Sequence, residues 1–359
     1  MPAESQLCDA GLRYETLVYL AGESGVPFDD VYAAFLVLYS GKPNVASTFM
    51  TMSGAKGYSR PDVTSNKAFT TLKILRKKLA GAWITPRDAW IKASEPHLCG
   101  LFDHSAVFAT DTVPIPIDST NGCYQPKYEE YVAKVCVTVL LNGYVVHWGE
   151  VLYTGASDDT VIGKHCGVLR LLEEHNKIAL VDGGFQEDRR FIRPFSKPQI
   201  YPKRLRPQQS VHQYKQEAHE KKVHNKLQGH IRGRAEHFFG RSLMGRFSAM
   251  KDWRWNHDAL HDAIACILLA LNVECFLVHK DAGRYPLPDE KYINELRAKG
   301  QAHTQQDKRY PESEPLPALK SNQKSKRNSS LRSYGRRTVM EVADDIEEKY
   351  VRDSKRKKK

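Results

Sequence analysis

Glu236 occupies a position in this sequence where a carboxylate needs a partner. It lies in residues 229–247, whose apolar side chains recur at four-residue steps, a pattern that predicts a helix with one buried stripe. Glu236 borders that stripe, and a carboxylate beside a core must be paired, bound to a metal or protonated. A simpler alternative is a surface ion pair with Arg232, one helical turn earlier. The stripe consists of Ile231, Ala235, Phe239, Leu243 and Phe247.

Two aspartates upstream of this helix lie in segments that predict strands. Asp111 is in the middle of residues 106–117, among valines and isoleucines, where Asp is disfavoured. Asp182 ends the strand predicted over 178–185 and precedes two glycines that would let a ligand approach closely. If these strands are neighbours, the later helix can bring Glu236 over both aspartates. Three such oxygen donors suit Mg²⁺ or Mn²⁺, and two ions would serve phosphoryl transfer.

Positive charge is concentrated in two parts of the 359-residue chain, which has a net charge of +12. Lys and Arg outnumber Asp and Glu by 17 to 6 in residues 185–256, and by 16 to 9 in residues 301–359. A general need for solubility would mix the charges more evenly, so this distribution indicates contact with nucleic acid. The arginines expected to hold phosphates are Arg232, Arg234, Arg241 and Arg246.

The elements that must position these residues predict a mixed α/β sheet. Strands are expected over 106–117, 134–141 and 144–153, with a hairpin turn at Asn142-Gly143 between the last two. A helix from Asp158 to about His175 then crosses over to a parallel strand at 178–185. The elements predicted after it are a loop over 186–210, helices over 211–226, 229–247 and 257–271, and a strand or helix extension over 273–278.

Residues 1–100 predict a helical region in front of this sheet. Its third helix, expected over 64–79 with Thr64 or Ser65 as its cap, is basic near its end. Such a region could dock on DNA as a helix-turn-helix, or could simply pack on the core. Its other helices are expected over 28–39, over 44–52 and from Thr85-Pro86 onward. We therefore divide the chain at 1–100, 101–280 and 281–359, the middle part being the catalytic domain.

Residues 281–359 predict a polar, basic and disordered tail. The cluster Lys355–Lys359 suggests nuclear import or nucleic-acid binding, although residues 338–351 could instead form a helix on the core. The seven cysteines form no C-x-x-C pair, which indicates reduced thiols and an intracellular protein. The longest apolar run, Ile264–Leu271, is far shorter than the ~18 residues of a membrane span, so no membrane partner is expected.

The segments that carry these acids also resemble a known family. Arg232–Arg241 resembles its Arg-x-x-Val-Glu-Arg-x-Phe-Gly signature, and Leu180–Phe185 resembles its second-Asp strand. Trp255–Asn272 resembles the downstream helix, which ends in Asn. In these features the chain is similar to DDE transposases of the PIF/Harbinger type, which are related to bacterial insertion-sequence transposases.

Two further motifs match with changes. Thr110–Ile117 resembles the first-Asp strand, but Thr112-Val113 replaces the usual Gly-Thr pair. Gly155–Thr160 resembles the family's Gly-x-x-His-Asp-Ser, so Asp159 takes the Asp position as an additional acidic residue and Asp158 replaces the His. Both aspartates could instead only cap the helix that follows Ser157.

The resemblance implies a ribonuclease-H-like fold and a cut-and-paste DNA transposase in the nucleus. Asp111, Asp182 and Glu236 would be its triad, holding two Mg²⁺ or Mn²⁺ ions. Its partners would be the transposon's terminal repeats, a transposon-encoded DNA-binding protein and further copies of the chain. The alternative is a domesticated DNA-binding or partner-recruiting protein that no longer cleaves, because the altered Thr112 and Asp158 lie near the triad.

Overall fold

A computed structural model gives the fold of the chain. The residues that it describes are 10–98, 102, 104–118, 124–125, 127–149, 153–154, 157–185, 188–200, 211–285 and 291. Almost all of the predicted tail, with its basic cluster and the alternative helix over 338–351, lies outside the described residues.

The sheet is organised around β1 (Phe108–Pro116). This strand pairs with β3 (Glu130–Leu140) in the antiparallel direction and with β6 (Ala179–Val181) in the parallel direction. The predicted first and fourth strands are therefore neighbours. A short strand that the sequence did not reveal, β7 (Phe191–Ile192), continues the sheet in parallel beyond β6. Its two residues are too few to show an alternating pattern, so the segment resembled a loop.

The other edge of β3 carries the rest of the sheet. The strand predicted over 144–153 is divided into β4 (Val145–Trp148) and β5 (Tyr153–Thr154), and both pair with β3. The predicted hairpin turn is present, with Gly143 at a φ of 98° that L side chains rarely adopt. A two-residue strand, β2 (Tyr124–Gln125), pairs with the beginning of β3.

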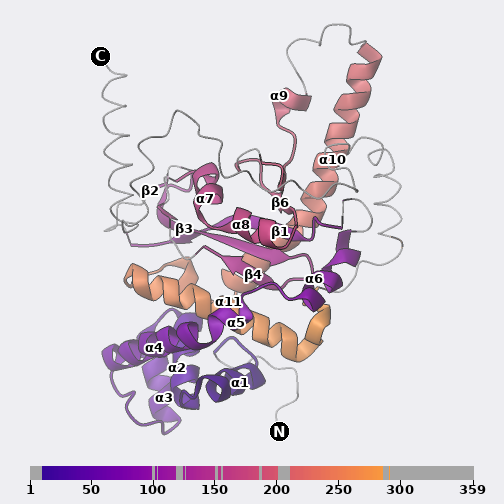
Figure 1. Ribbon diagram of the computed structural model, residues 1–359. Coiled ribbons are helices and arrows are strands. Elements are labelled where there is room, and N and C mark those ends of the chain that lie inside the picture. The colour runs from indigo at the N-terminus through magenta and orange to yellow at the C-terminus, as the bar shows by residue number, and fades with distance from the viewer. Residues whose placement is uncertain are drawn as a thin grey trace, which may run out of the picture.

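Helices cover both faces of the sheet (Figure 1). The helices α7 (Asp159–His165), α8 (Val168–Glu174) and α10 (Val211–His237) lie on one side, and α11 (His257–His279) lies on the other. The predicted crossover helix is broken into α7 and α8 by Gly167, whose φ of 86° is incompatible with a continuous helix.

The two helices predicted over 211–226 and 229–247 form one continuous helix. α10 runs without interruption to His237 and then widens into a π-helical turn, η4 (Phe238–Leu243). The described residues of the predicted stripe after Glu236, which are Phe239, Leu243 and Phe247, are all buried, and Phe238 is buried as well. Short elements complete this half of the chain: α9 (Lys197–Ile200), η5 (Ser248–Lys251) and η6 (Lys280–Ala282).

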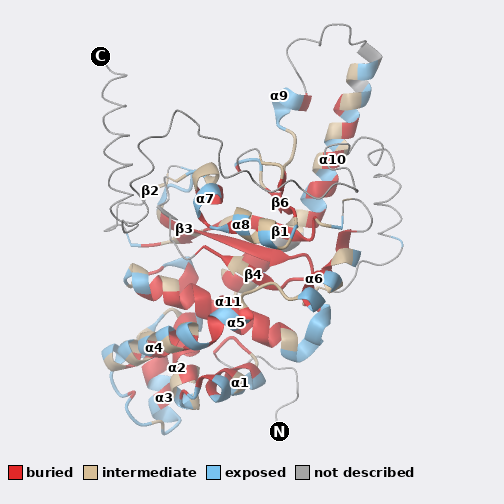
Figure 2. Cartoon of the chain, in the orientation of Figure 1, coloured by how far each residue is buried: buried red, intermediate tan, exposed pale blue. Residues whose placement is uncertain are grey.

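α11 is the central helix of the core. It lies between the sheet and the N-terminal helices, and most of its residues are buried (Figure 2). The stretch 273–278 extends this helix instead of forming a strand. The segment His257–Ala282 is long and apolar enough to cross a membrane by length and composition. However, 78% of its apolar 18-residue stretch is buried inside the protein. A core helix shows this same pattern.

The N-terminal helices pack against α11 through α1 and α4. α4 begins at Pro61, three residues before the predicted cap, because Pro is well suited to a first helical position. Thr64 is instead buried within the first turn. The helix expected to open at Pro86 begins at Asp88. The elements are α1 (Tyr14–Ser24), α2 (Phe28–Ser40), α3 (Pro43–Met52), α4 (Pro61–Leu75), η1 (Arg76–Ala80), α5 (Gly81–Trp83), α6 (Asp88–Ser94) and η2 (Glu95–Leu98).

Candidate active site

Asp111 and Asp182 lie on adjacent parallel strands. In the register of β1 and β6, Thr110 is opposite Val181, and each aspartate is the next residue along its chain. Asp111 is still within β1, whereas Asp182 follows the last residue of β6. Parallel pairing therefore brings both carboxylates to the same end of the sheet, as the sequence predicted.

Arg232 on α10 connects both aspartates with Glu236. Its Nη1 lies 2.9 Å from Asp111 Oδ2, and its Nη2 lies 3.7 Å from Asp182 Oδ1 and 2.5 Å from Glu236 Oε1. The arginine side chain is only 13% exposed. A single guanidinium thus contacts the three carboxylates that were predicted as the triad, which come from β1, from the end of β6 and from α10. We call Asp111, Asp182, Glu236 and Arg232 the carboxylate cluster.

Of the two interpretations of Glu236, the ion pair is confirmed and metal binding stays a prediction. The simple ion pair with Arg232, one turn earlier, is present. The same arginine nevertheless contacts Asp111 and Asp182, so the pair belongs to a larger group. The side chains of Asp182 and Glu236 are 50% and 52% exposed, whereas that of Asp111 is 19% exposed. Asp111 therefore forms the floor of the cluster, and the other two carboxylates border solvent.

Burial dominates the electrostatics of Asp111. It raises the pKa of this carboxyl from its usual value to about 6, because the charged form loses hydration. The Arg232 guanidinium and a 2.8 Å hydrogen bond from the Thr112 amide oppose the rise. The nearby carboxylates of Asp182 and Asp159 add to it. An additional cation at this position would favour the charged form of Asp111.

Asp159 is a fourth carboxylate beside the cluster. The helix cap is its neighbour Asp158, which accepts a 2.8 Å hydrogen bond from the Val161 amide. Asp159 is not used for capping, and its Oδ1 accepts a 2.8 Å hydrogen bond from the Thr112 hydroxyl. The other oxygen of Asp159 lies beside Gly184, where a Cβ would come within 2.7 Å of it. Gly184, the second of the two glycines after Asp182, thus allows this close approach.

Lys134 on β3 is a charged residue of this region that the sequence analysis overlooked. It is 6% exposed, its Nζ donates a 2.8 Å hydrogen bond to the Ser157 carbonyl, and Nζ lies 3.8 Å from Asp159 Oδ1. Burial lowers the pKa of this lysine. The available signal was a lysine at the start of an apolar strand, where an unpaired charge would be unfavourable.

The predicted phosphate-binding arginines have different surroundings. Arg232 contacts carboxylates, and Arg246 forms a 2.9 Å ion pair with Glu274 of α11. Arg241 is exposed on η4. The side chain of Arg234 lies outside the described residues. DNA binding by these four residues stays a prediction, and the geometry leaves Arg241 the most accessible of the three described side chains.

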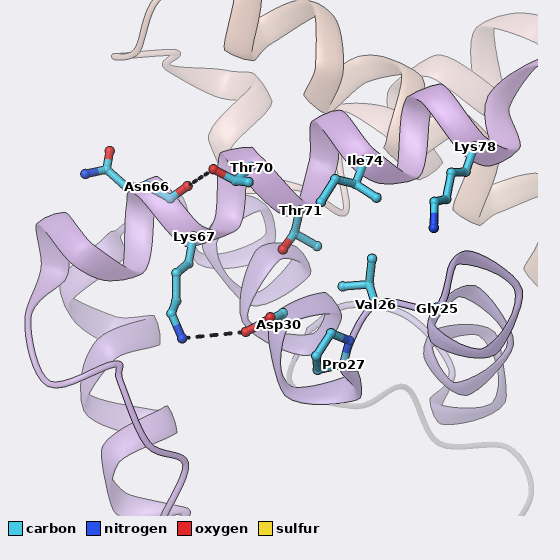
Figure 3. A pocket seen from close by; sticks show the side chains of 10 residues that line it. All are labelled: Gly25, Val26, Pro27, Asp30, Asn66, Lys67, Thr70, Thr71, Ile74 and Lys78. Atoms are coloured by element: carbon cyan, nitrogen blue, oxygen red, sulfur yellow. Dashed lines mark hydrogen bonds and ion pairs between the residues drawn. The ribbon is translucent and has the colours of Figure 1, made fainter.

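A separate pocket lies among the N-terminal helices (Figure 3). It has a volume of about 410 Å³, and no residue of the carboxylate cluster lines it. Its charged groups have partners within the protein: Lys67 pairs with Asp30 at 3.8 Å, and Lys78 donates to the Ser24 carbonyl. The candidate active site is therefore the carboxylate cluster. The pocket is lined by Gly25, Val26, Pro27, Asp30, Asn66, Lys67, Thr70, Thr71, Ile74 and Lys78.

The donor atoms of the cluster suit a hard divalent cation. Asp111, Asp182 and Glu236 offer only carboxylate oxygens, which Mg²⁺ and Mn²⁺ prefer. Within the described ranges, however, no three His, Cys, Asp or Glu side chains are arranged as a metal-binding group. The guanidinium of Arg232 contacts an oxygen of each carboxylate, so a metal could bind these oxygens only if Arg232 moved.

Comparison with known proteins agrees with this geometry. Residues 109–278 match the model of a family described as DDE superfamily endonuclease. No curated protein and no solved structure matched the chain. The matched segment extends from β1 into the last residues of α11 and includes Asp111, Asp159, Asp182 and Glu236. Its mixed sheet with flanking helices is consistent with a ribonuclease-H-like core. The match thus supports a DDE transposase family for this chain, through the endonuclease segment at residues 109–278.

Proposed function

We propose that the protein is a metal-dependent DNA endonuclease that cleaves and joins strands as a cut-and-paste transposase of the PIF/Harbinger type. The observation that carries this proposal is the meeting of Asp111, Asp182 and Glu236 at one guanidinium. The match to DDE superfamily endonucleases over the same segment supports DNA as the substrate.

In this proposal, the three carboxylates hold two Mg²⁺ or Mn²⁺ ions. Asp111 and Asp182 would help to hold both ions, and Glu236 would help to hold the second. The bound ions would activate the attacking oxygen and stabilise the leaving one. Asp111 fixes the position of the site, because it is within a paired strand and largely buried. Asp159, held by Thr112 and near Lys134, adds negative charge beside the cluster.

The sources of DNA specificity stay predictions. We propose terminal repeats as the substrate, with a transposon-encoded DNA-binding protein and further copies of the chain as partners, in the nucleus. Of the predicted phosphate-binding arginines with described side chains, Arg241 is the exposed one and so has the clearest access to a phosphate backbone. The N-terminal helices could contribute to DNA binding through the basic segment at Lys73, Arg76, Lys77 and Lys78, as predicted from the sequence.

Nicking of supercoiled plasmid with Mg²⁺ or Mn²⁺ tests the proposal. Asp182→Asn keeps the shape of the side chain and removes its charge, so it should abolish nicking while DNA binding and thermal melting stay close to those of the wild type. Asp158→Asn is the matched control, because Asn is also a good helix cap and Asp158 lies outside the cluster. Nicking by Asp182→Asn at the wild-type rate would refute the assignment.

The same assay separates the enzyme from the domesticated alternative. A wild-type chain that binds DNA but does not nick it with either metal, even on DNA that carries its own terminal repeats, would be a binding protein. Glu236→Gln provides a second check on the site. Its carboxylate is half exposed, so the substitution should reduce nicking without unfolding the protein.

A further inference from the structure

We propose that Arg232 is an exchangeable counter-ion, which neutralises the carboxylate cluster in the metal-free protein and moves to a DNA phosphate when metal binds. This inference rests on the proposed function, since it concerns the same metal site. Its basis is that the guanidinium contacts Asp111 Oδ2, Asp182 Oδ1 and Glu236 Oε1. These oxygens would also be the ligands of a metal.

Competition between the arginine and a metal follows from space and charge. A guanidinium at 2.5 to 3.7 Å from the three oxygens occupies the volume between them. A metal bonded to the same oxygens at about 2.0–2.1 Å would need that volume. Two divalent cations beside a fixed guanidinium would also repel it in this partly buried environment. The arginine and the metals therefore exclude each other.

Arg232 is held in a way that permits release. Two of its three ion-pair partners, Asp182 and Glu236, are about half exposed, so solvent reaches one side of the cluster. Its Nε is buried and has no hydrogen-bond partner among the described residues, so the terminal nitrogens make the contacts that hold the side chain. One turn earlier on α10, a Cβ added to Gly229 would meet nothing within 4 Å. This open space offers the released side chain a path away from the carboxylates.

The exchange couples metal binding to DNA binding. In the metal-free protein the guanidinium is occupied by carboxylates, so it is not available to a phosphate. Metal binding alone leaves the guanidinium without an anionic partner. When metal and DNA bind together, the carboxylates contact the metal and the guanidinium contacts a phosphate, so every charge has a partner. Each ligand should therefore increase the affinity for the other by the same factor.

Calorimetric titration with Mn²⁺, with and without a short DNA duplex, tests this coupling. In the wild type the duplex should tighten Mn²⁺ binding by about tenfold or more, the usual range of coupling between two sites. Arg232→Gln should bind Mn²⁺ more tightly than the wild type without DNA, and the duplex should no longer change its affinity. Thermal melting of Arg232→Gln with Mn²⁺ establishes that the variant is folded.

Two further variants make the test specific. Arg232→Lys keeps the positive charge but loses the planar double contact, so it should shift Mn²⁺ affinity in the same direction by less. Arg241→Gln removes another arginine of the same segment, one that is exposed and is not part of the carboxylate cluster. It should weaken DNA binding while leaving the coupling factor unchanged, which separates exchange from a general loss of positive charge.

The results distinguish failure of this inference from failure of the proposed function. If the wild type and Arg232→Gln bind Mn²⁺ equally, and the duplex changes both equally, the exchange is overturned and the metal site remains. If neither protein binds Mn²⁺ with or without DNA, the metal-dependent function is overturned together with the exchange.

Discussion

The hydroxyl of Thr112 on β1 donates a 2.8 Å hydrogen bond to the carboxylate of Asp159 at the start of α7. The two residues are 47 positions apart and belong to different layers of the fold. Thr112 follows Asp111, so the same strand supplies the most buried acid of the carboxylate cluster and the hydroxyl that positions Asp159. Where the family pattern has Gly-Thr, this chain has Thr112-Val113. The hydroxyl of Thr112 thus makes a specific contact with Asp159.

Thr112→Val should lower DNA nicking while reducing the free energy of unfolding by only about 1 kcal/mol, the usual effect of one lost hydrogen bond. The shape of the side chain is kept, but Asp159 loses its donor. The matched control is Thr110→Val, which also lies on β1 and removes a buried hydrogen bond to Thr138 of β3. The control should lose at least as much stability and retain nicking. A larger loss of nicking in Thr110→Val than in Thr112→Val would contradict the role of Thr112.

Gly184→Ala should disturb the site more than Gly183→Ala does. A Cβ at Gly184 would lie 2.7 Å from Asp159 Oδ2, so the carboxylate must move. A Cβ at Gly183 would meet only Pro194, at an ordinary contact distance of 3.6 Å. Nicking rates and Mn²⁺ affinities of both variants would check this expectation. Equal effects would show that the position of Asp159 does not matter to the site.

Asp111→Asn should stabilise the metal-free protein at neutral and alkaline pH. The pKa of Asp111 is raised to about 6, so between pH 4 and 6 the folded protein holds a proton that the unfolded chain releases. The contribution of this group to stability therefore falls as pH rises through that range and stays low above it. The substitution removes this loss and should increase the free energy of unfolding at pH 8 by about 2 kcal/mol.

Denaturant unfolding at pH 4, 6 and 8 would measure this difference. The gain should shrink towards pH 4, where the wild-type carboxyl is itself protonated. Saturating Mn²⁺ should stabilise the wild type and have little effect on Asp111→Asn, which lacks a ligand. If the increase in the free energy of unfolding did not change with pH, it would come from packing and not from removal of a buried charge.

Gly245→Ala should destabilise the turn after η4. A Cβ there would lie 2.6 Å from the Gly240 carbonyl oxygen and 2.9 Å from that of Arg241, and backbone atoms cannot move aside cheaply. Gly240→Ala is the control, since its Cβ would meet nothing within 4 Å. We expect a loss of about 2 kcal/mol for Gly245→Ala and little change for Gly240→Ala, measured by thermal or denaturant unfolding. Similar stabilities for the two variants would contradict the close approach.

The sequence predicted the parts of the fold that follow from strand pairing. The sequence analysis allowed the first and fourth predicted strands to lie side by side, and β1 and β6 do pair in parallel. Asp111 was recognisable because Asp is disfavoured inside a strand. Helix ends were less accurate: α4 begins three residues early at Pro61, and Gly167 divides the helix predicted from Asp158 to His175. These features depend on backbone geometry that periodicity alone does not specify.

The central role of Arg232 could not be predicted from its own segment. On an isolated helix it is simply a partner for Glu236, and only the sheet brings Asp111 and Asp182 to the same guanidinium. Lys134 was overlooked for a similar reason, because its acceptor, the Ser157 carbonyl, lies 23 residues away. Contacts of this kind arise from tertiary packing. The catalytic roles of the three acids stay predictions until the variants are measured.

The central position of α11 has a consequence for the order in which the chain folds during synthesis. This helix is the last long one among the described residues, yet it packs on α1, α4 and β4, which the ribosome produces much earlier. Side-chain hydrogen bonds from its Asn272 to the carbonyls of Trp83 and Val145 span 189 and 127 residues. At typical rates of about 5–20 residues per second, the early helices wait roughly ten seconds or more with apolar faces uncovered. The nascent chain should therefore depend on chaperones until residue 279 has emerged.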